Sequence, residues 1–119
     1  MCGLTLVLWQ QNRELLLWLL GRRQRVRVAG RSMLPTYQPG QELFVDPHAY
    51  RHRLPQEGDV VVAWHPHERE MKIVKRVTAV LENGRLLLAG DNRAESSDSR
   101  HFGAVHPSQL IGKISGKFG

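Results

Sequence analysis

The pattern of apolar and polar residues changes at Gly21. Two apolar runs, 4–9 and 15–20, come before this glycine and are separated by five polar residues. Leucine-rich runs of this kind predict an amphipathic or apolar helix within residues 1–24. After the glycine the pattern becomes extended, so we expect a single β-domain over residues 25–119.

Six segments after Gly21 have the features of β-strands. They are short, rich in β-branched residues or leucine, and bounded by turn-forming residues. The predicted strands are 25–28, 42–46, 59–64, 71–80, 85–89 and 111–114. Asn83-Gly84 predicts a hairpin turn, because this pair tolerates the positive φ of a type I′ turn. Residues 90–103 are too polar for a strand or helix and are expected to form a structured loop, so the fold class is mainly β with one N-terminal helix.

Composition and charge narrow the possible partners. The chain has 119 residues, of which 41% are hydrophobic and 24% charged, as in a single globular domain. The one cysteine, Cys2, excludes an internal disulfide and a zinc site built on thiolates. The net charge is +6, and five arginines lie within residues 22–31. This cluster can face water or an anionic membrane, whereas the lack of aromatic residues within it argues against nucleic acid.

The N-terminal segment lacks the pattern of a membrane-spanning helix. Such a helix needs about 20 mostly apolar residues, and Arg13 and Glu14 would lie at hydrocarbon depth. A cleavable signal peptide would have a basic start, one apolar run and a small-residue cleavage site. We therefore expect a helix that docks on the protein or lies in a membrane interface. The expected location is cytoplasmic with peripheral membrane contact through residues 1–31, and the alternative is an N-terminal membrane anchor.

Ser32 is the first candidate for chemistry. It lies in a predicted turn, with Gly30 before it and Pro35 after it. Tight turns expose a hydroxyl and direct backbone N–H groups to one point, which an acyl-transfer site needs for its oxyanion. A serine in such a turn is usually only a turn former. Ser32 alone therefore does not establish catalysis.

Lys75 is the one charged residue on an otherwise apolar strand face. With a period of two, Ile73, Lys75 and Val77 point the same way, together with Met71 and Ala79. Burial disfavours the ammonium form and lowers the pKa of a lysine. A neutral amine can accept a proton from serine in the Ser-Lys variant of the catalytic triad. The alternative is a lysine whose amine reaches solvent at the edge of the sheet.

Three segments together resemble the type I signal peptidase family. They are SMLPT at 32–36, IVKRV at 73–77 and GDNRAESSDSRHFG at 90–103, in the family's order. The segment GDVVV at 58–62 is similar to the remaining sequence box. The resemblance covers about residues 25–114. It implies a catalytic β-fold, a peptide or protein substrate, hydrolysis through an acyl-enzyme, and a Ser/Lys dyad without a metal or organic cofactor.

The resemblance also implies a role for individual residues. Ser32 matches the nucleophile, and its backbone N–H would be one oxyanion donor. Lys75 matches the general base, and Ser96 occupies the position whose hydroxyl orients the lysine amine. The supporting positions that the resemblance implies are Gly30, Asp91, Arg76, Asp98 and Arg100. The positions that it implies for shaping the turn and binding the substrate are Met33, Pro35 and Ile73.

Three departures distinguish this chain from the family's usual pattern. Gly30 stands where many members have a serine that donates its hydroxyl to the oxyanion, and Thr78–Glu82 replaces the usual Gly-Leu-Pro-Gly-Asp. Only nine residues separate Val80 from Gly90, so the large accessory β-domain of the family is absent. This minimal core is most similar to the nickel-type superoxide dismutase maturation proteases. That branch implies, as substrate, the N-terminal propeptide of a nickel superoxide dismutase precursor.

Other functions compete with this interpretation. A membrane-associated leader peptidase or a self-cleaving regulator would use the same dyad, although the Ala-Gly bond at 29–30 lies too close to Ser32 for self-cleavage. A pure binding module would require the dyad to be accidental. A Ser-His-Asp arrangement around His101 lacks the Gly-x-Ser-x-Gly elbow. A metal site is less favoured than a Pro-rich turn, because a spacing of two on a loop is no ligand signature; its ligands would be His65, His67 and Glu68.

Overall fold

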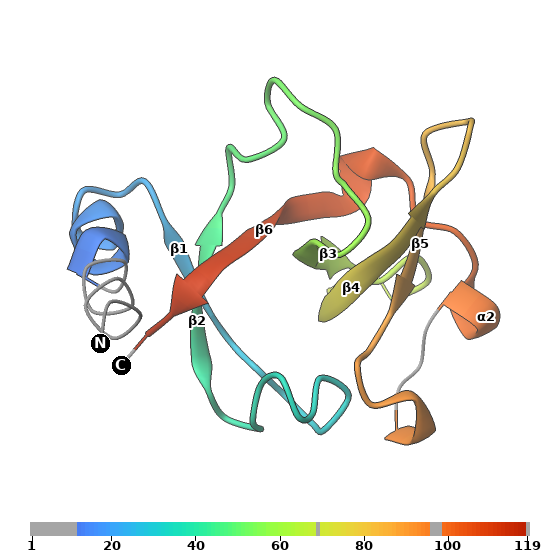
Figure 1. Cartoon of the computed structure of the whole chain (residues 1–119), viewed down its shortest axis with the longest axis horizontal. Helices are drawn as coiled ribbons and strands as arrows, with labels where there is room; N and C mark the ends of the chain where they lie inside the picture. Colours follow the sequence, from blue (N-terminus) through green and yellow to red (C-terminus); the bar gives the residue numbers. More distant parts are fainter. Residues whose placement is uncertain (1–11, 69, 96–98, 119) are drawn as a thin grey trace, which may run out of the picture.

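The fold is one antiparallel sheet with a short helix packed at one end (Figure 1). The computed structural model describes residues 12–68, 70–95 and 99–118, and residues 12–19 are helical. The strands follow in the order β1-β2-β6-β3-β4-β5 across the sheet. Their bounds are β1 Gln24–Arg27, β2 Glu42–Asp46, β3 Val60–Trp64, β4 Lys72–Val80, β5 Leu86–Ala89 and β6 Leu110–Lys117. The prediction of a mainly β fold is confirmed.

Five of the six predicted strands match the observed bounds to within one residue, but β6 is longer than predicted. The sequence pattern marked only 111–114, because Gly116 lowers strand propensity beyond that segment. Both glycines lie at close contacts, and Gly112 lies at the closer one. A Cβ on Gly112 would clash with the carbonyl oxygen of Asp46, and a Cβ on Gly116 would lie 3.2 Å from Cγ of Glu14. Since β6 pairs with both β2 and β3, its backbone is held along its whole length.

The hairpin between β4 and β5 forms as predicted, but its turn type was predicted wrongly. Among the described residues only glycines have positive φ, so Asn83 does not adopt the type I′ conformation. Gly84 has φ 85° and donates its N–H to the carbonyl of Leu81 at 2.9 Å. The Asn83 side chain accepts the N–H of Arg85 at 3.0 Å. This side-chain hydrogen bond closes the turn by a route that asparagine commonly uses.

The 90–103 segment contains two short helices, which the sequence analysis did not predict. They are the 3-10 helix η1, Arg93–Glu95, and α2, Ser99–Phe102. Phe102 is only 6% exposed and packs with Leu86 and Val105 in the core. One helical turn brings this aromatic side chain inward, so burial outweighs the polar composition of the segment.

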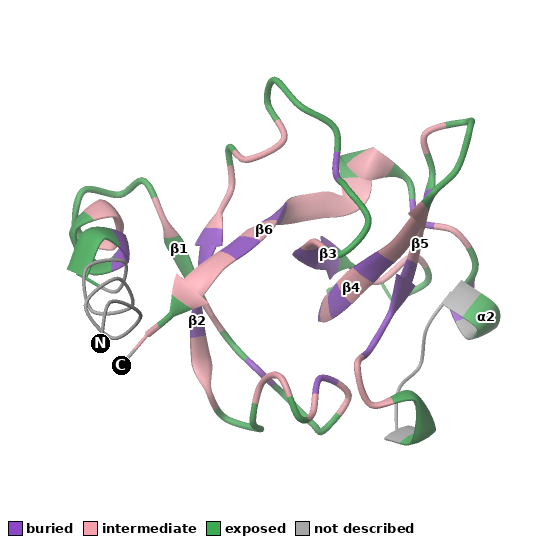
Figure 2. Ribbon diagram, in the orientation of Figure 1, coloured by how far each residue is buried: buried purple, intermediate pink, exposed green. Residues whose placement is uncertain are grey.

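Apolar side chains bury both faces of the central strand β3. Its alternating residues enter two different core clusters, and Figure 2 shows the buried positions gathered on the strands. Such two-sided burial gives a continuous apolar strand sequence, here VVVAW. The first cluster comprises Val61, Ala63, Ile73, Val77, Leu86, Leu88, Phe102 and Val105. The second comprises Val28, Met33, Leu43, Val45, Val60, Val62 and Ile114.

The N-terminal helix docks on the sheet through a polar group and an aromatic ring. Glu14 is 5% exposed, and its Oε2 accepts hydrogen bonds from Arg23 Nε at 2.9 Å and Ser115 Oγ at 2.7 Å. Trp18 packs edge-to-face on Phe118, with ring centroids 5.5 Å apart. Within the described part of the chain, no helix is both long and apolar enough to cross a bilayer. The rest of the predicted helix, residues 1–11, lies outside the described residues.

Candidate active site

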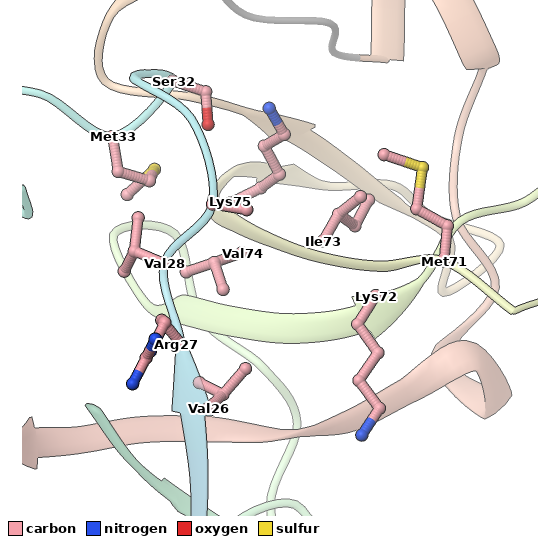
Figure 3. A pocket seen from close by; sticks show the side chains of 11 residues that line it. Val26, Arg27, Val28, Ser32, Met33, Met71, Lys72, Ile73, Val74 and Lys75 are labelled. Atoms are coloured by element: carbon pink, nitrogen blue, oxygen red, sulfur yellow. The ribbon is translucent and has the colours of Figure 1, made fainter. Parts of the chain in front are cut away.

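A pocket of about 300 Å³ lies between residues 26–29 and the first half of β4. Ser32 and Lys75 both line it, and in Figure 3 their side chains extend toward the same end of this space. Ser32 belongs to the turn that follows β1, whereas Lys75 lies on a central strand. The fold therefore brings together two residues 43 positions apart that the sequence analysis singled out. The pocket is lined by Val26, Arg27, Val28, Ala29, Ser32, Met33, Met71, Lys72, Ile73, Val74 and Lys75.

Lys75 is only 5% exposed, although it is a charged residue type. It pairs with Val61 on β3, and its strand neighbours on the same face, Ile73 and Val77, are buried in the core. The expected apolar face of β4 is thus present. This burial agrees with a lysine that lies inside the protein. It argues against the alternative, in which the amine reaches solvent at the edge of the sheet.

The turn that carries Ser32 is held by hydrogen bonds to Asn92. The N–H of Asn92 donates to the carbonyl of Ser32 at 2.8 Å, and its side-chain amide donates to the carbonyl of Arg31 at 3.1 Å. Met33 is fully buried and anchors the turn in the core. Gly30 has φ 74°, a conformation that strains any residue with a Cβ. That backbone geometry gives a physical reason for glycine at this position instead of serine.

Asp91 links the Ser32 turn to the strand that carries Lys75. Its Oδ1 accepts from Arg76 Nε at 2.8 Å and its Oδ2 accepts from Arg76 Nη2 at 2.9 Å, a bidentate pair. The Thr36 hydroxyl also donates to Asp91 Oδ2. We call Asp91, Asn92, Arg76 and Thr36 the Asp91 clamp. Its position beside both Ser32 and Lys75 makes it suited to fixing their relative placement.

Hydrogen bonds to Asp91 favour its ionised form. Those from Arg76, with a smaller contribution from Thr36, hold the pKa of Asp91 below its ordinary value, although burial opposes this shift. The same pair raises the pKa of Arg76. Arg76 Nη1 also donates a hydrogen bond to the carbonyl of Gly58 at 2.7 Å. Asp91 and Arg76 within the clamp are therefore both charged near neutral pH.

The other predicted site residues divide into three groups. Ile73 is buried and lines the pocket, while Pro35 is exposed and follows a cis peptide bond from Leu34. Arg100 lies in α2 and is exposed. Ser96 and Asp98 lie outside the described residues.

Sequence reasoning gave no role to Thr36 and Asn92. Both lie inside the motifs that carried the resemblance, but their partners are distant in sequence. Thr36 bonds to a residue 55 positions away, and Asn92 bonds to one 61 positions away. The motif spacing could have marked them as candidates, but only the folded chain identifies their partners.

The metal-site alternative receives no support from the β3–β4 turn. His65 Nδ1 accepts the N–H groups of His67 and Glu68, each at 3.1 Å, so its ring caps a local turn. Among the residues that the structure describes, no three His, Cys, Asp or Glu side chains gather as metal ligands. The Pro-rich turn predicted as the more favoured interpretation explains this neighbourhood.

Comparison with known proteins gives the same family for most of the chain. The family model described as "Signal peptidase, peptidase S26" matches residues 15–81 and 78–118. Signal peptidase IB of Staphylococcus aureus strains N315 and COL is 46% identical over 39 residues, which cover 33% of this chain and 20% of the relative. The mitochondrial ATP-independent inner membrane protease subunit 1b of Arabidopsis thaliana is 29% identical over 107 residues, covering 71% of this chain and 63% of the relative. The chain thus matches less than two thirds of the length of these relatives.

Proposed function

The chain belongs to the signal peptidase family, peptidase S26, and from this premise we propose that it is a serine endopeptidase with a Ser32/Lys75 dyad. The proposal rests mainly on the observation that Ser32 and Lys75 line the same pocket. Ser32 is half-buried in a braced turn, and Lys75 is a nearly inaccessible lysine that lines the same space. A hydroxyl and a buried amine in one pocket are the groups that acyl transfer requires.

In the proposed mechanism, the neutral Lys75 amine takes the proton of the Ser32 hydroxyl while Oγ attacks the carbonyl carbon of the scissile bond. The backbone N–H of Ser32 stabilises the oxyanion of the tetrahedral intermediate. The Lys75 ammonium then gives its proton to the leaving amine, and an acyl-enzyme forms on Ser32. Lys75 next deprotonates a water molecule, which attacks the ester carbon. The C–Oγ bond then breaks, and the Lys75 ammonium returns its proton to Ser32 Oγ, which regenerates both residues.

The edge of β4 supports an extended mode of substrate binding. Residues Lys72–Arg76 of β4 pair with β3, but the pairing with β5 begins only at Arg76. In the described part of the chain, no strand pairs with residues 72–75 on the side of β5. A peptide can add to an unpaired strand edge through backbone hydrogen bonds, with its side chains directed into neighbouring pockets. Ile73, which lies in this stretch, would then contact the substrate.

For the substrate, we propose the N-terminal propeptide of a nickel superoxide dismutase precursor. The support is the resemblance to that branch, together with the short hairpin over residues 81–85 where larger family members carry an accessory domain. The resemblance implies that cleavage frees an amine and a histidine with which the partner binds nickel. This chain would act on the precursor without holding nickel itself. Processing of secretory leader peptides is the alternative.

The substrate proposal is tested by incubating the purified protein with the dismutase precursor and, in parallel, with a secretory precursor. We expect a new N-terminus in the dismutase by mass spectrometry, and no product with the Ser32→Ala protein. Cleavage of the secretory precursor alone would replace the dismutase assignment by the leader-peptidase alternative. If neither precursor is cut and no peptide from a random library is cut, the peptidase proposal itself is wrong.

We further propose peripheral contact with an anionic membrane surface through the N-terminal helix. Its docking face uses Glu14 and Trp18, so the apolar residues of its other face are left exposed. These are Leu15, Leu16, Leu19 and Leu20, which are 39%, 56%, 67% and 64% exposed. Arg13 and Arg22, both exposed, flank them along the chain. Apolar residues bordered by arginines are typical of helices that lie in the interface of anionic lipids.

Vesicle flotation tests the membrane contact. We expect the protein to float with vesicles that contain phosphatidylglycerol, and the double variant Leu16→Ser/Leu19→Ser to remain in the dense fraction. Leu54→Ser is the matched control, because Leu54 is 75% exposed and lies in the loop between β2 and β3. Equal flotation of the double variant and the wild type would contradict the contact.

A further inference from the structure

The pocket beside Ser32 has an uneven charge along its length. Among its lining residues are three basic side chains, Arg27, Lys72 and Lys75, and no carboxylate. Lys75 lies near Ser32, whereas Arg27 and Lys72 lie at the other end in Figure 3. The walls between these ends are apolar and include Val28 and Val74. A substrate in this pocket would therefore extend from the proposed dyad toward a positively charged region formed by Arg27 and Lys72.

The contacts of Arg27 leave this region with an excess of positive charge. Arg27 Nη2 lies 3.0 Å from Glu42 Oε1, and Arg25 Nε lies 3.2 Å from the other oxygen of the same carboxylate. One carboxylate thus serves two guanidinium groups. The side chain of Arg27 is 70% exposed, so this pair is weak and its guanidinium is accessible to a ligand.

Lys72 has a contact that leaves its charge in place. Its Nζ lies 5.4 Å from the centroid of the Trp64 ring, a cation–π arrangement. An aromatic ring positions an ammonium group without neutralising it. Lys72 and Arg27, from two different elements, thus supply the charged side chains at the end of the pocket away from Ser32.

We propose that this protein selects extended substrates that carry an acidic side chain three or four residues from the scissile bond, bound by Lys72 and Arg27. This inference rests on the proposed peptidase function. Lys72 precedes Lys75 by three residues, which is about 10 Å along a strand at roughly 3.3 Å per residue. An added substrate strand advances at the same rate, so its third or fourth residue from the cleaved bond lies opposite Lys72. Aspartate or glutamate at that position meets two cations, of which Arg27 also pairs with Glu42 from outside the pocket wall.

A peptide series measures this preference directly. Starting from one cleavable sequence, each position from two to five residues on either side of the scissile bond is occupied in turn by Glu, Gln or Lys. At the position opposite Lys72, we expect kcat/KM for Glu to exceed that for Gln by about fivefold, the size of one exposed ion pair. Lys at this position should be cleaved more slowly than Gln. Raising the salt to 1 M should remove most of the difference, because the charges are accessible to solvent.

Three substitutions assign the preference to these residues. Lys72→Gln should reduce the Glu-to-Gln ratio toward one, and Lys72→Glu should reverse the order so that the Lys peptide is preferred. Arg27→Gln should reduce the ratio in part. Arg85→Gln is the matched control, because it removes the same charge from an exposed position in the β4–β5 hairpin. We expect this control to keep the wild-type ratio.

Binding to the Ser32→Ala protein separates this inference from the peptidase proposal. Fluorescence anisotropy with labelled Glu and Lys peptides reports the charge preference without any cleavage. If the peptides are cut at equal rates whatever the charge, the acidic preference is wrong and the peptidase function stands. If no peptide is cut but the Glu peptide still binds more tightly, the pocket assignment stands and the peptidase proposal is wrong. If charge affects neither cleavage nor binding, the inference is overturned.

Discussion

Two carboxylates attach different parts of the chain to the same sheet, and their surroundings differ. Glu14 holds the N-terminal helix through one oxygen, which accepts from Arg23 and Ser115. Asp91 uses both oxygens, and its partners lie on the Ser32 turn and next to Lys75. The first carboxylate fixes a helix against the end of the sheet, whereas the second joins the two segments that carry the proposed dyad. A hydrogen-bonded carboxylate thus attaches the helix in one region, and in the other it connects the two segments of the proposed dyad.

The comparison predicts that loss of the Glu14 contacts lowers stability alone, whereas loss of the Asp91 contacts lowers both stability and activity. Losing the Glu14 contacts should loosen the helix, because Arg23 would lose its shorter ion pair and keep only the one to Asp46 at 3.6 Å. Losing the Asp91 contacts should also let the Ser32 turn move relative to Lys75. If both variants behave alike in activity, the distinction between attachment and alignment is wrong.

The largest effect is expected from the dyad itself, with both carboxylate networks left intact. Ser32→Ala should lower kcat by about a millionfold, as for other serine nucleophiles. Lys75→Met, which keeps the volume of the buried side chain, should lower kcat by about 10²–10⁴, the usual contribution of a general base. Peptide hydrolysis and thermal unfolding are measured on the same preparations. A fully active Lys75→Met protein would remove the proposed mechanism.

The second-largest effect is expected at Asp91, the carboxylate that joins the Ser32 turn to the strand of Lys75. Asp91→Asn removes the charge that holds Arg76, and the Ser32 turn should then be placed less accurately. We expect kcat/KM to fall by about tenfold to a hundredfold, because small displacements of reacting groups are costly. Stability should fall by about 2 kcal/mol, the value of hydrogen bonds to a charged group. Urea unfolding and peptide hydrolysis give the two numbers.

Retention of wild-type activity in Asp91→Asn, despite a measured loss of stability, would reduce the Asp91 clamp to a purely structural feature. Thr36→Val provides a smaller version of the same test. It removes one hydrogen bond to Asp91 but leaves the bidentate pair with Arg76 in place. Its activity should lie between those of the wild type and Asp91→Asn.

At Glu14 we expect a loss of stability without a loss of activity. Glu14→Gln keeps an oxygen for Ser115 but removes the charge opposite Arg23, whose side chain is mostly buried. Leaving that guanidinium with a weaker partner should cost about 2 kcal/mol of unfolding free energy. Hydrolysis at a temperature well below the unfolding midpoint should match the wild type. A tenfold loss of kcat under those conditions would mean that the helix also influences the site.

The sequence predicted the Asp91 region better than the Glu14 region, for a physical reason. Ser32, Lys75 and Asp91 lie in motifs whose residue types and order suggest chemistry before the fold is known. Glu14 interrupts an apolar run, so the sequence suggested only that it disfavours membrane insertion. Its role depends on Ser115, 101 positions away, and on the space that Gly116 leaves for its side chain. Contacts over such distances along the chain leave no periodic signal.

The strands illustrate the same limit within the fold. Short segments bounded by turn residues were located to within one residue, because their local pattern is sufficient. The extension of β6 was missed, since it runs through Gly116, where a Cβ would lie 3.2 Å from Cγ of Glu14. The helical turn at Phe102 was missed because one buried ring determines it. Where packing between distant segments decides the structure, a local pattern does not predict it.

The smallest expected effect is the change with pH in the stability that the Asp91 clamp contributes. The pKa of Asp91 is lowered in the folded protein, first by hydrogen bonds from Arg76. A depressed carboxyl pKa contributes stability that is present above the unfolded value, about 3.9, and is lost as pH falls through the folded value. The difference in unfolding free energy between the wild type and Asp91→Asn should thus be largest above pH 5 and shrink below pH 4. Asp59, whose lowered pKa results from hydrogen bonds with Gln56 and Tyr50 that outweigh its burial, is present in both proteins and cancels. Urea unfolding of both proteins between pH 3 and 7 measures this difference, and a constant value across the range would show that Arg76 does not stabilise the ionised carboxylate.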